Sequence, residues 1–356
     1  MEEKRLKKVV FVNLRLTGGG SEKVMAMLAS YFADHGIETQ MILLEEKERT
    51  YPVSDNVEII DCYCPMEGNK IIWHIKRILS LRKAIKKTGA DTVVSFMWDI
   101  NMKVILACIG LNKRIIISER ADPNNVSRKR SMAFAQRWIF PLADAAVFQT
   151  VQVMNSYPEK VRRKGVIIPN PIPMITIDRN VEKEKTIIAA GRLYKQKNFE
   201  MMIEAFAIFS KKHDEYKLKI FGDGDLRENL EQKARELGVA EKVSFQGFVS
   251  NLKEEMNKAC IYASSSNYEG ISNAMLEAMA IGLPAVCTDC PVGGAAMVIK
   301  DHVNGILVPV NDHEKMAKAF CEIAEDDKLA MCLSENAIET CKQYSIDIIS
   351  KLWMEL

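Results

Sequence analysis

Short apolar runs alternate with amphipathic helical patterns along the chain. In the first half the runs are rich in Val, Ile and Phe, and they predict strands over 9–13, 39–44, 92–96, 114–118, 145–149 and 165–168. Between them, apolar positions recur at the helical period and predict helices over 21–35 and 70–87. Strands that alternate with helices are typical of a parallel, doubly wound α/β sheet.

The segment Pro169-Asn-Pro-Ile-Pro173 interrupts this alternation, because proline continues neither a helix nor a central strand. The alternation then restarts, with strands over 186–190, 217–221, 243–246, 261–263, 285–288 and 305–308, and helices over 199–211 and 226–237, from 271 and from 312. A chain of 356 residues suits two domains. The sequence predicts two Rossmann-like domains, 1–170 and 174–335, and a helical tail, 336–356, that packs back on the first domain.

Basic residues are concentrated in the first half of the chain. Up to Pro173 there are 27 Lys and Arg against 18 Asp and Glu, whereas the remainder has 22 against 29. The excess lies in segments 70–87, 128–137 and 160–164. The pattern of segment 70–87 predicts a basic amphipathic helix that could bind an anionic membrane surface. The alternative is an ordinary helix whose apolar face packs on the core and whose basic face is solvated. The net charge of +2 argues against a nucleic-acid partner.

Other compositional features exclude several classes of protein. No apolar run approaches the roughly 20 residues of a membrane span, and the first residues do not form a secretory signal. We therefore expect a cytoplasmic protein, peripheral on the inner face of the cell membrane. The nine cysteines are scattered, so we interpret Cys62, Cys64, Cys287 and Cys290 as small buried side chains. The five histidines show no metal-ligand spacing, and we predict no metal.

Two glycine-containing loops follow predicted strands. Segment 17–21, Thr-Gly-Gly-Gly-Ser, opens the first helix; its glycines allow the backbone to approach an anion, and Ser21 is expected to cap the helix. Arg192 and Lys197 follow the first strand of the second domain, where ligands of doubly wound sheets bind, and both side chains suit phosphate. A tight turn and a solvated basic loop are the alternatives. We interpret Asp223-Gly-Asp225 as a turn rather than a metal site.

Glu269 and Glu277 lie eight positions apart. Glu269 is in a polar loop after a predicted strand, and Glu277 is placed two turns into a helix that starts near Ile271. Eight helical residues span about 12 Å, and N–H groups at a helix start favour phosphate. The segment could hold two hydroxyl-binding carboxylates with an anion site between them, or it could be an amphipathic helix with solvated acids.

Together these motifs resemble glycosyltransferase family 4, whose members are retaining enzymes with the GT-B fold, two Rossmann-like domains facing across a cleft. The resemblance rests on Gly18-Gly-Gly20, Gly191-Arg192, Lys197, Gly222-Asp-Gly224, Glu269-x7-Glu277, Gly293-Gly294 and segment 304–308. The family often has a glutamate at the position of Met297. Ser118-Glu119-Arg120 stands near the position where many members carry a histidine. This variant resembles a bacterial subset that builds surface polysaccharides and glycans from UDP-hexoses or N-acetylhexosamines.

The resemblance implies transfer of a hexose or N-acetylhexosamine from a UDP-sugar to a lipid-linked glycan, with retention and without a metal or cofactor. It implies a catalytic set of Glu269, Arg192, Lys197 and Glu119, with Glu119 and Arg120 at the acceptor. The implied donor-binding residues are Gly18, Gly19, Arg192, Lys197, Gly222, Phe248, Glu269, Gly270, Ile271, Ser272, Asn273 and Glu277. A UDP-sugar epimerase of the same fold and a non-catalytic subunit that binds sugar nucleotides remain alternatives.

Overall fold

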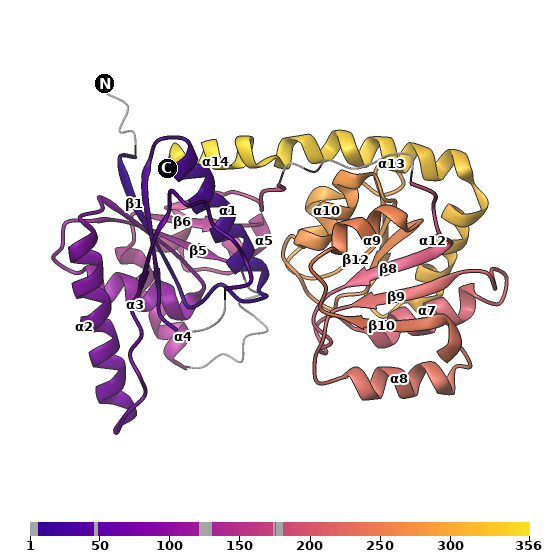
Figure 1. Cartoon of the computed structure of the whole chain (residues 1–356), viewed down its shortest axis with the longest axis horizontal. Helices are drawn as coiled ribbons and strands as arrows, with labels where there is room; N and C mark the ends of the chain where they lie inside the picture. The colour runs from indigo at the N-terminus through magenta and orange to yellow at the C-terminus, as the bar shows by residue number, and fades with distance from the viewer. Residues whose placement is uncertain (1–5, 46–48, 121–129, 174, 176–180) are drawn as a thin grey trace. The chain divides into compact units, whose positions relative to one another are not determined.

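A computed structural model of the chain describes residues 6–45, 49–120, 130–173, 175 and 181–356. The chain divides into two compact units (Figure 1). The first comprises 1–173 together with 346–356, and the second comprises 174–345. The division falls at the predicted proline-rich linker.

The first unit is built on a parallel sheet of seven strands in its described part, in the order β3-β2-β1-β4-β5-β6-β7. These strands are β1 (Lys8–Asn13), β2 (Glu38–Leu43), β3 (Glu58–Asp61), β4 (Thr92–Phe96), β5 (Arg114–Glu119), β6 (Ala145–Phe148) and β7 (Gly165–Ile167). The central strands are mainly apolar because both faces of a parallel sheet are covered. Phe11 of β1, for example, is fully buried and packs edge-on against Phe32 at 5.6 Å.

Helices connect these strands. They are α1 (Gly20–Asp34), α2 (Lys70–Thr88), α3 (Trp98–Cys108), α4 (Arg130–Phe134), η1 (Ala135–Ile139), η2 (Phe140–Leu142), α5 (Val151–Asn155) and α6 (Glu159–Arg162). The boundaries of α2 follow from its sequence. The side chain of Asn69 accepts a hydrogen bond from the Ile71 N–H at the start, and Gly89 adopts φ +68° at the end.

The second unit repeats the design with a parallel sheet in the order β10-β9-β8-β11-β12-β13. Its strands are β8 (Thr186–Ala190), β9 (Lys217–Phe221), β10 (Val243–Gly247), β11 (Ile261–Ser264), β12 (Ala285–Asp289) and β13 (Ile306–Pro309). Its helices are α7 (Phe199–Phe209), α8 (Arg227–Glu236), η3 (Ala240–Lys242), α9 (Leu252–Lys258), α10 (Asn273–Ile281), α11 (Gly294–Val298), α12 (His313–Glu325), α13 (Asp327–Cys341) and η4 (Lys342–Tyr344). Both units are therefore doubly wound, as predicted.

The C-terminal helix α14 (Ile346–Met354) belongs to the first unit. Trp353 is 1% exposed and joins the core of that unit, 5.6 Å from the ring of Phe96. The predicted tail began ten residues too early. Residues 336–345 stay with the second unit because α13 packs on α10.

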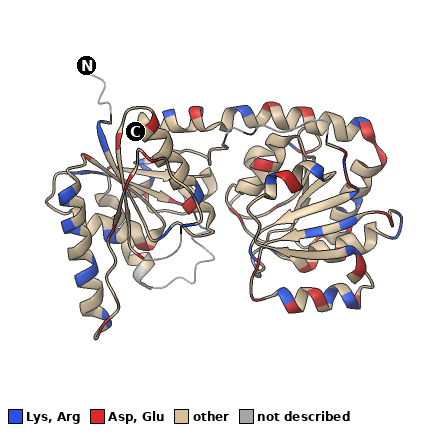
Figure 2. Ribbon diagram, in the orientation of Figure 1, with Lys and Arg blue, Asp and Glu red and all other residues tan. Residues whose placement is uncertain are grey.

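The helix α2 differs from an ordinary core-facing helix. Leu81 and Ile85 are buried in its C-terminal half, but Ile71, Ile72, Ile75 and Leu79 are 53–70% exposed. Lysines also lie along this helix, as Figure 2 shows. Among the described residues, no helix is both long and apolar enough to cross a membrane.

Candidate active site

The order of the strands in the second unit brings the predicted residues to one edge of its sheet. β8 and β11 are neighbours although they are far apart in sequence, and the chain turns to opposite sides of the sheet after them. Ligands of doubly wound sheets bind at the carboxyl edge of such a pair. The loop with Arg192 and Lys197 follows β8, and the loop with Glu269 follows β11.

Lys197 and Glu269 form an ion pair, with 2.5 Å between Lys197 Nζ and Glu269 Oε1. Both side chains are mostly covered, at 14% and 19% exposed. The other carboxylate oxygen of Glu269 accepts a hydrogen bond from Ser266 Oγ at 2.7 Å. A mostly buried charge without a partner is costly, so each of these residues holds the other in place.

Hydrogen bonds join the two loops that carry this pair. Ser265 Oγ donates to the carbonyl of Lys197 at 2.9 Å, and Asn267 Nδ2 donates to the carbonyl of Lys195 at 2.8 Å. Gln196 Nε2 donates to the carbonyl of Tyr268 at 3.1 Å. The ammonium and the carboxylate are therefore positioned by a rigid backbone frame, the arrangement that a preorganised site requires.

Glycines are required where the neighbouring loops meet. Gly222 follows β9 with φ +121°, and a Cβ there would lie 2.1 Å from the carbonyl oxygen of Gly191. A Cβ on Gly191 would lie 2.7 Å from Cε of Lys197. The close approach of these strand ends lets the aliphatic part of Lys197 lie across the backbone of Gly191.

The helix α10 begins at Asn273, two residues later than predicted. Ser272 is its N-cap, and Ser272 Oγ accepts from the Met275 N–H at 3.4 Å. Glu277 consequently lies one turn into the helix, not two, and it is 4% exposed. Glu277 is therefore no solvated acid, and the positive end of the helix dipole lies between the two glutamates.

The turn before α11 packs on the Glu269 loop. The Glu269 N–H donates to the carbonyl of Pro291 at 3.3 Å, and a Cβ on Gly294 would lie 1.9 Å from the carbonyl oxygen of Gly270. Val292 adopts φ +82° in this turn, a strained conformation for a β-branched residue. Ser266, Glu269, Gly270 and Ser272 border a small hollow between these loops.

Two further predicted residues are exposed at the same edge. The guanidinium of Arg192 lies 5.6 Å from the ring centre of Tyr194, and no carboxylate of the described residues lies within ion-pairing distance of it. Phe248, just after β10, is 63% exposed. Asp223 accepts a hydrogen bond from the Gly224 N–H at 2.9 Å, as a turn residue does.

The cysteines near this site are buried thiols. Burial raises the pKa of Cys290 to about 11 and that of Cys287 well above its usual value. Both are therefore protonated at neutral pH, which suits their interpretation as small buried side chains.

In the first unit, Gly18 and Gly19 lie between β1 and α1. Gly18 adopts φ +58°, and Gly19 is the N-cap, whose N–H donates to Oε2 of Glu22 at 3.4 Å. The prediction that Ser21 caps α1 is wrong. Ser21 lies inside the helix, and Ser21 Oγ donates to Sδ of Met97 after β4 instead.

The structure places Glu119 inside the protein. It is 2% exposed at the end of β5, and its two oxygens accept hydrogen bonds from Asn101 Nδ2 at 2.5 Å and Tyr157 OH at 2.9 Å. Direct contact of Glu119 with an acceptor, which we had expected, is not supported because this carboxylate is covered and hydrogen-bonded. Glu119 instead holds together β5, α3 and the start of the 157–162 segment.

Arg120 is half-buried and stacks on aromatic rings. Its guanidinium carbon lies 4.4 Å from the ring centre of Phe96 and 5.8 Å from that of Trp353 in α14. Arg120 also donates hydrogen bonds to Ser118 Oγ and Asn170 Oδ1. Its observed contacts fasten the C-terminal helix to the first sheet, a role that sequence reasoning missed.

Comparison with known proteins gives matches along nearly the whole chain. Residues 18–174 match the family model described as Glycosyltransferase Family 4, and residues 175–340 match Glycosyl transferases group 1. A Campylobacter jejuni enzyme is 30% identical over 98% of both chains. Its name is GalNAc-alpha-(1->4)-GalNAc-alpha-(1->3)-diNAcBac-PP-undecaprenol alpha-1,4-N-acetyl-D-galactosaminyltransferase.

This chain belongs to glycosyltransferase family 4. A second C. jejuni relative is 29% identical over 92% of this chain and 93% of its own. Its name is N-acetylgalactosamine-N,N'-diacetylbacillosaminyl-diphospho-undecaprenol 4-alpha-N-acetylgalactosaminyltransferase. Solved GT-B structures share the fold of this glycosyltransferase. Anabaena HepE with UDP and glucose has a TM-score of 0.82 at 16% identity over 98% of both chains. S. aureus TarM has a TM-score of 0.81 at 14% identity over 99% of each chain.

Replacing Glu119 by Gln tests its buried position. Burial raises the pKa of Glu119 to about 7 from 4.5, so the folded protein retains the proton while the unfolded chain loses it. The free energy of unfolding therefore falls as pH rises from about 4.5 to about 7, by up to about 3 kcal/mol, and is then constant. Glu119→Gln removes this loss. The variant's Tm relative to wild type should rise between about pH 5 and about pH 8; an unchanged difference would contradict the assignment.

Proposed function

We propose that this glycosyltransferase moves a hexose or N-acetylhexosamine from a UDP-sugar to a lipid-linked glycan, with retention of the anomeric configuration. The Lys197–Glu269 pair beside the start of α10 carries the proposal, because it places a cation, a carboxylate and a helix N-terminus at one edge of one sheet. The names of both C. jejuni relatives specify N-acetylgalactosamine transfer to diphospho-undecaprenol glycans. We therefore favour an N-acetylhexosamine.

Each charged group has a proposed part in the transfer. Glu269 accepts hydrogen bonds from the hydroxyls of the donor sugar, and Glu277 binds the ribose. Arg192, Lys197 and the N–H groups at the start of α10 bind the diphosphate. Phe248 and Gly222 complete the donor contacts of the second unit. Because the groups around the diphosphate are cationic or are N–H donors, the proposed reaction needs no metal.

The chemical step follows from this charge arrangement. The bond between the anomeric carbon and the phosphate oxygen breaks, so positive charge develops on the sugar and negative charge on the leaving UDP. Preorganised groups aimed at that developing negative charge stabilise the transition state. A phosphate oxygen of the leaving UDP accepts the proton of the acceptor hydroxyl, which attacks the same face.

Removing either member of the ion pair should abolish most transfer. We expect Lys197→Ala and Glu269→Ala to lower kcat/KM by about 100-fold or more, the usual cost of one transition-state contact. Lys195→Ala is the matched control, since this neighbouring lysine is exposed, and a chelator should leave the initial rate unchanged. Transfer is measured from each UDP-sugar to a short diphospholipid-linked glycan.

Binding of UDP separates the two roles. UDP carries the diphosphate but lacks the donor sugar, so Lys197→Ala should clearly weaken UDP binding, whereas Glu269→Ala should mainly remove the extra affinity of the UDP-sugar. Unchanged turnover in both variants would refute the site. Conversion of a UDP-sugar without any acceptor would identify an epimerase, and UDP binding without turnover on any acceptor would identify a non-catalytic subunit.

The configuration of the product tests retention. A UDP-hexose carries its sugar as the α-anomer, and we expect an α-linked product. The coupling constant of the new anomeric proton, read by NMR, reports the configuration directly, because a glycosidic bond does not mutarotate. A β-linked product would show inversion and would contradict the proposed same-face attack.

The exposed face of α2 is proposed to bind an anionic membrane surface, where a lipid-linked acceptor is found. Ile72, Ile75 and Leu79 recur every three or four residues and are more than half exposed, and Lys76 and Lys83 are exposed beside them. Apolar side chains that enter a lipid interface, flanked by lysines that contact anionic headgroups, are typical of interfacial helices.

Serine at Ile72, Ile75 and Leu79 should abolish binding to vesicles that contain phosphatidylglycerol. The Tm should barely change, because these side chains are exposed in the folded protein. Serine at Met331 and Ile348, which are exposed elsewhere, is the matched control. Sedimentation with anionic and neutral vesicles measures the effect, and equal binding to both would exclude the electrostatic part of the proposal.

A further inference from the structure

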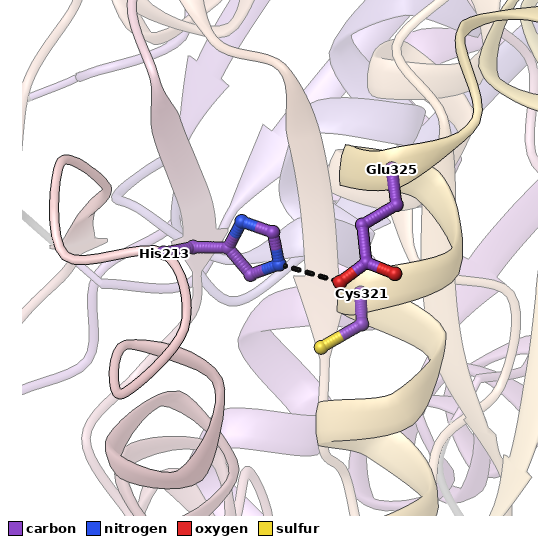
Figure 3. Close-up of side chains that lie close together, drawn as sticks. All are labelled: His213, Cys321 and Glu325. Carbon is purple, nitrogen blue, oxygen red and sulfur yellow. Dashed lines mark hydrogen bonds and ion pairs between the residues drawn. The ribbon is translucent and has the colours of Figure 1, made fainter.

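Three side chains with metal-binding atoms meet in the second unit. His213 lies in the turn after α7, and Cys321 and Glu325 are one turn apart on α12 (Figure 3). One ligand atom from each, namely a ring nitrogen, a sulfur and a carboxylate oxygen, lies within 4.8 Å of the other two. Among the described residues no other group of His, Cys, Asp and Glu meets this condition.

The histidine ring is held in place by aromatic neighbours. It stacks on Phe209 with 4.6 Å between ring centres and meets Tyr216 edge-on at 6.0 Å. The His213 side chain is 14% exposed, and its Nε2 lies 3.0 Å from Oε1 of Glu325. Nε2 therefore faces the carboxylate without any change of rotamer.

The surrounding fold favours a cation at this position. Glu325 is the last residue of α12, and α7 ends four residues before His213. The C-terminal end of a helix carries partial negative charge, so two helix ends add to the carboxylate. Near the thiol of Cys321, the carboxylates of Glu325 and Glu322 add negative charge, and the ammonium of Lys212 adds positive charge.

The identity of the donor atoms selects the class of metal. One imidazole nitrogen, one thiol sulfur and one carboxylate oxygen suit Zn²⁺ and similar transition metals, whereas Mg²⁺ and Ca²⁺ prefer oxygen ligands alone. Two ligands at i and i+4 on a helix with a third from another segment leave one tetrahedral position for water. Metal–ligand bonds of roughly 2.0–2.3 Å require small side-chain movements from the present spacing, in which every pair of ligand atoms is within 4.8 Å.

We propose that His213, Cys321 and Glu325 form a binding site for Zn²⁺ or a similar thiophilic divalent metal. The metal joins the end of α7 to the end of α12. On binding, the thiol of Cys321 releases its proton to solvent and coordinates as thiolate. The site lies where β9 begins, at the amino edge of the sheet, whereas Lys197 and Glu269 lie at the carboxyl edge, so it is independent of the proposed transfer reaction.

Co²⁺ is a suitable probe, because a cobalt–thiolate bond gives an intense charge-transfer absorption. The metal-free protein should show this absorption with one equivalent of Co²⁺ and lose it when Zn²⁺ is added. Cys321→Ser should abolish the band, and His213→Ala should weaken Zn²⁺ affinity at least roughly tenfold. Cys332→Ser and His313→Ala, which alter exposed residues outside the cluster, are the matched controls.

Thermal unfolding gives a second readout. Zn²⁺ in excess should raise the Tm of the wild type by several degrees. It should not raise the Tm of Cys321→Ser or of His213→Ala. Circular dichroism establishes that the variants fold. Absence of the cobalt–thiolate band in the wild type, or a band that persists in Cys321→Ser and disappears in Cys332→Ser, would overturn the proposal. Neither measurement depends on UDP or on transfer activity.

Discussion

The loop frame at the carboxyl edge of the second sheet depends on the ion pair between Lys197 and Glu269. Neither charge is freely solvated, and each loses its compensation if the other is removed. The pair therefore forces the loops after β8 and β11 together, and the hydrogen bonds of Ser265, Gln196 and Asn267 reinforce that approach. In the proposed reaction, Lys197 would exchange its contact with Glu269 for the donor phosphate, and Glu269 would exchange its contact with Lys197 for the sugar hydroxyls. The stability of the loop frame and the proposed affinity for the donor therefore depend on the same two side chains.

The sequence predicted both sheets well for a physical reason. Strands of a parallel sheet are buried on both faces, so each appears as a contiguous apolar run. Every predicted strand was confirmed within two residues. No such signal exists for β3, whose pattern at Glu58–Asp61 is half polar, and several helices, α3 and α9 among them, were also missed. Arg192, Lys197 and Glu269 were predicted to follow strands that end at a shared edge, and the structure brings Lys197 and Glu269 together there. Their contacts depend on the strand order, which no local pattern contains.

Side-chain burial was the least predictable property. Glu119 and Arg120 follow an apolar strand, as a catalytic pair would, yet partners from distant segments cover them: Asn101, Tyr157, Asn170 and Trp353. The apolar side chains of α2 deviate in the opposite direction, since the helical period suggests a buried stripe and the structure leaves its first half exposed. In both cases tertiary packing decided the outcome. A polar residue in the interior and an apolar residue at the surface are the positions where such deviations carry functional information.

The polarity of the second sheet explains why anions and cations would bind at opposite edges. In a parallel α/β unit each helix that follows a strand starts near the carboxyl edge and ends near the amino edge. Helix dipoles therefore make the carboxyl edge positive, where α10 begins beside Lys197, and the amino edge negative, where α7 and α12 end beside Glu325. A diphosphate bound at the first edge is already compensated by N–H groups and cations, so a metal there would compete with them. A metal at the second edge meets imidazole, thiol and carboxylate donors and the negative ends of two helices. The polarity of one sheet thus accounts for both proposals, transfer without a metal at the carboxyl edge and a metal site at the amino edge.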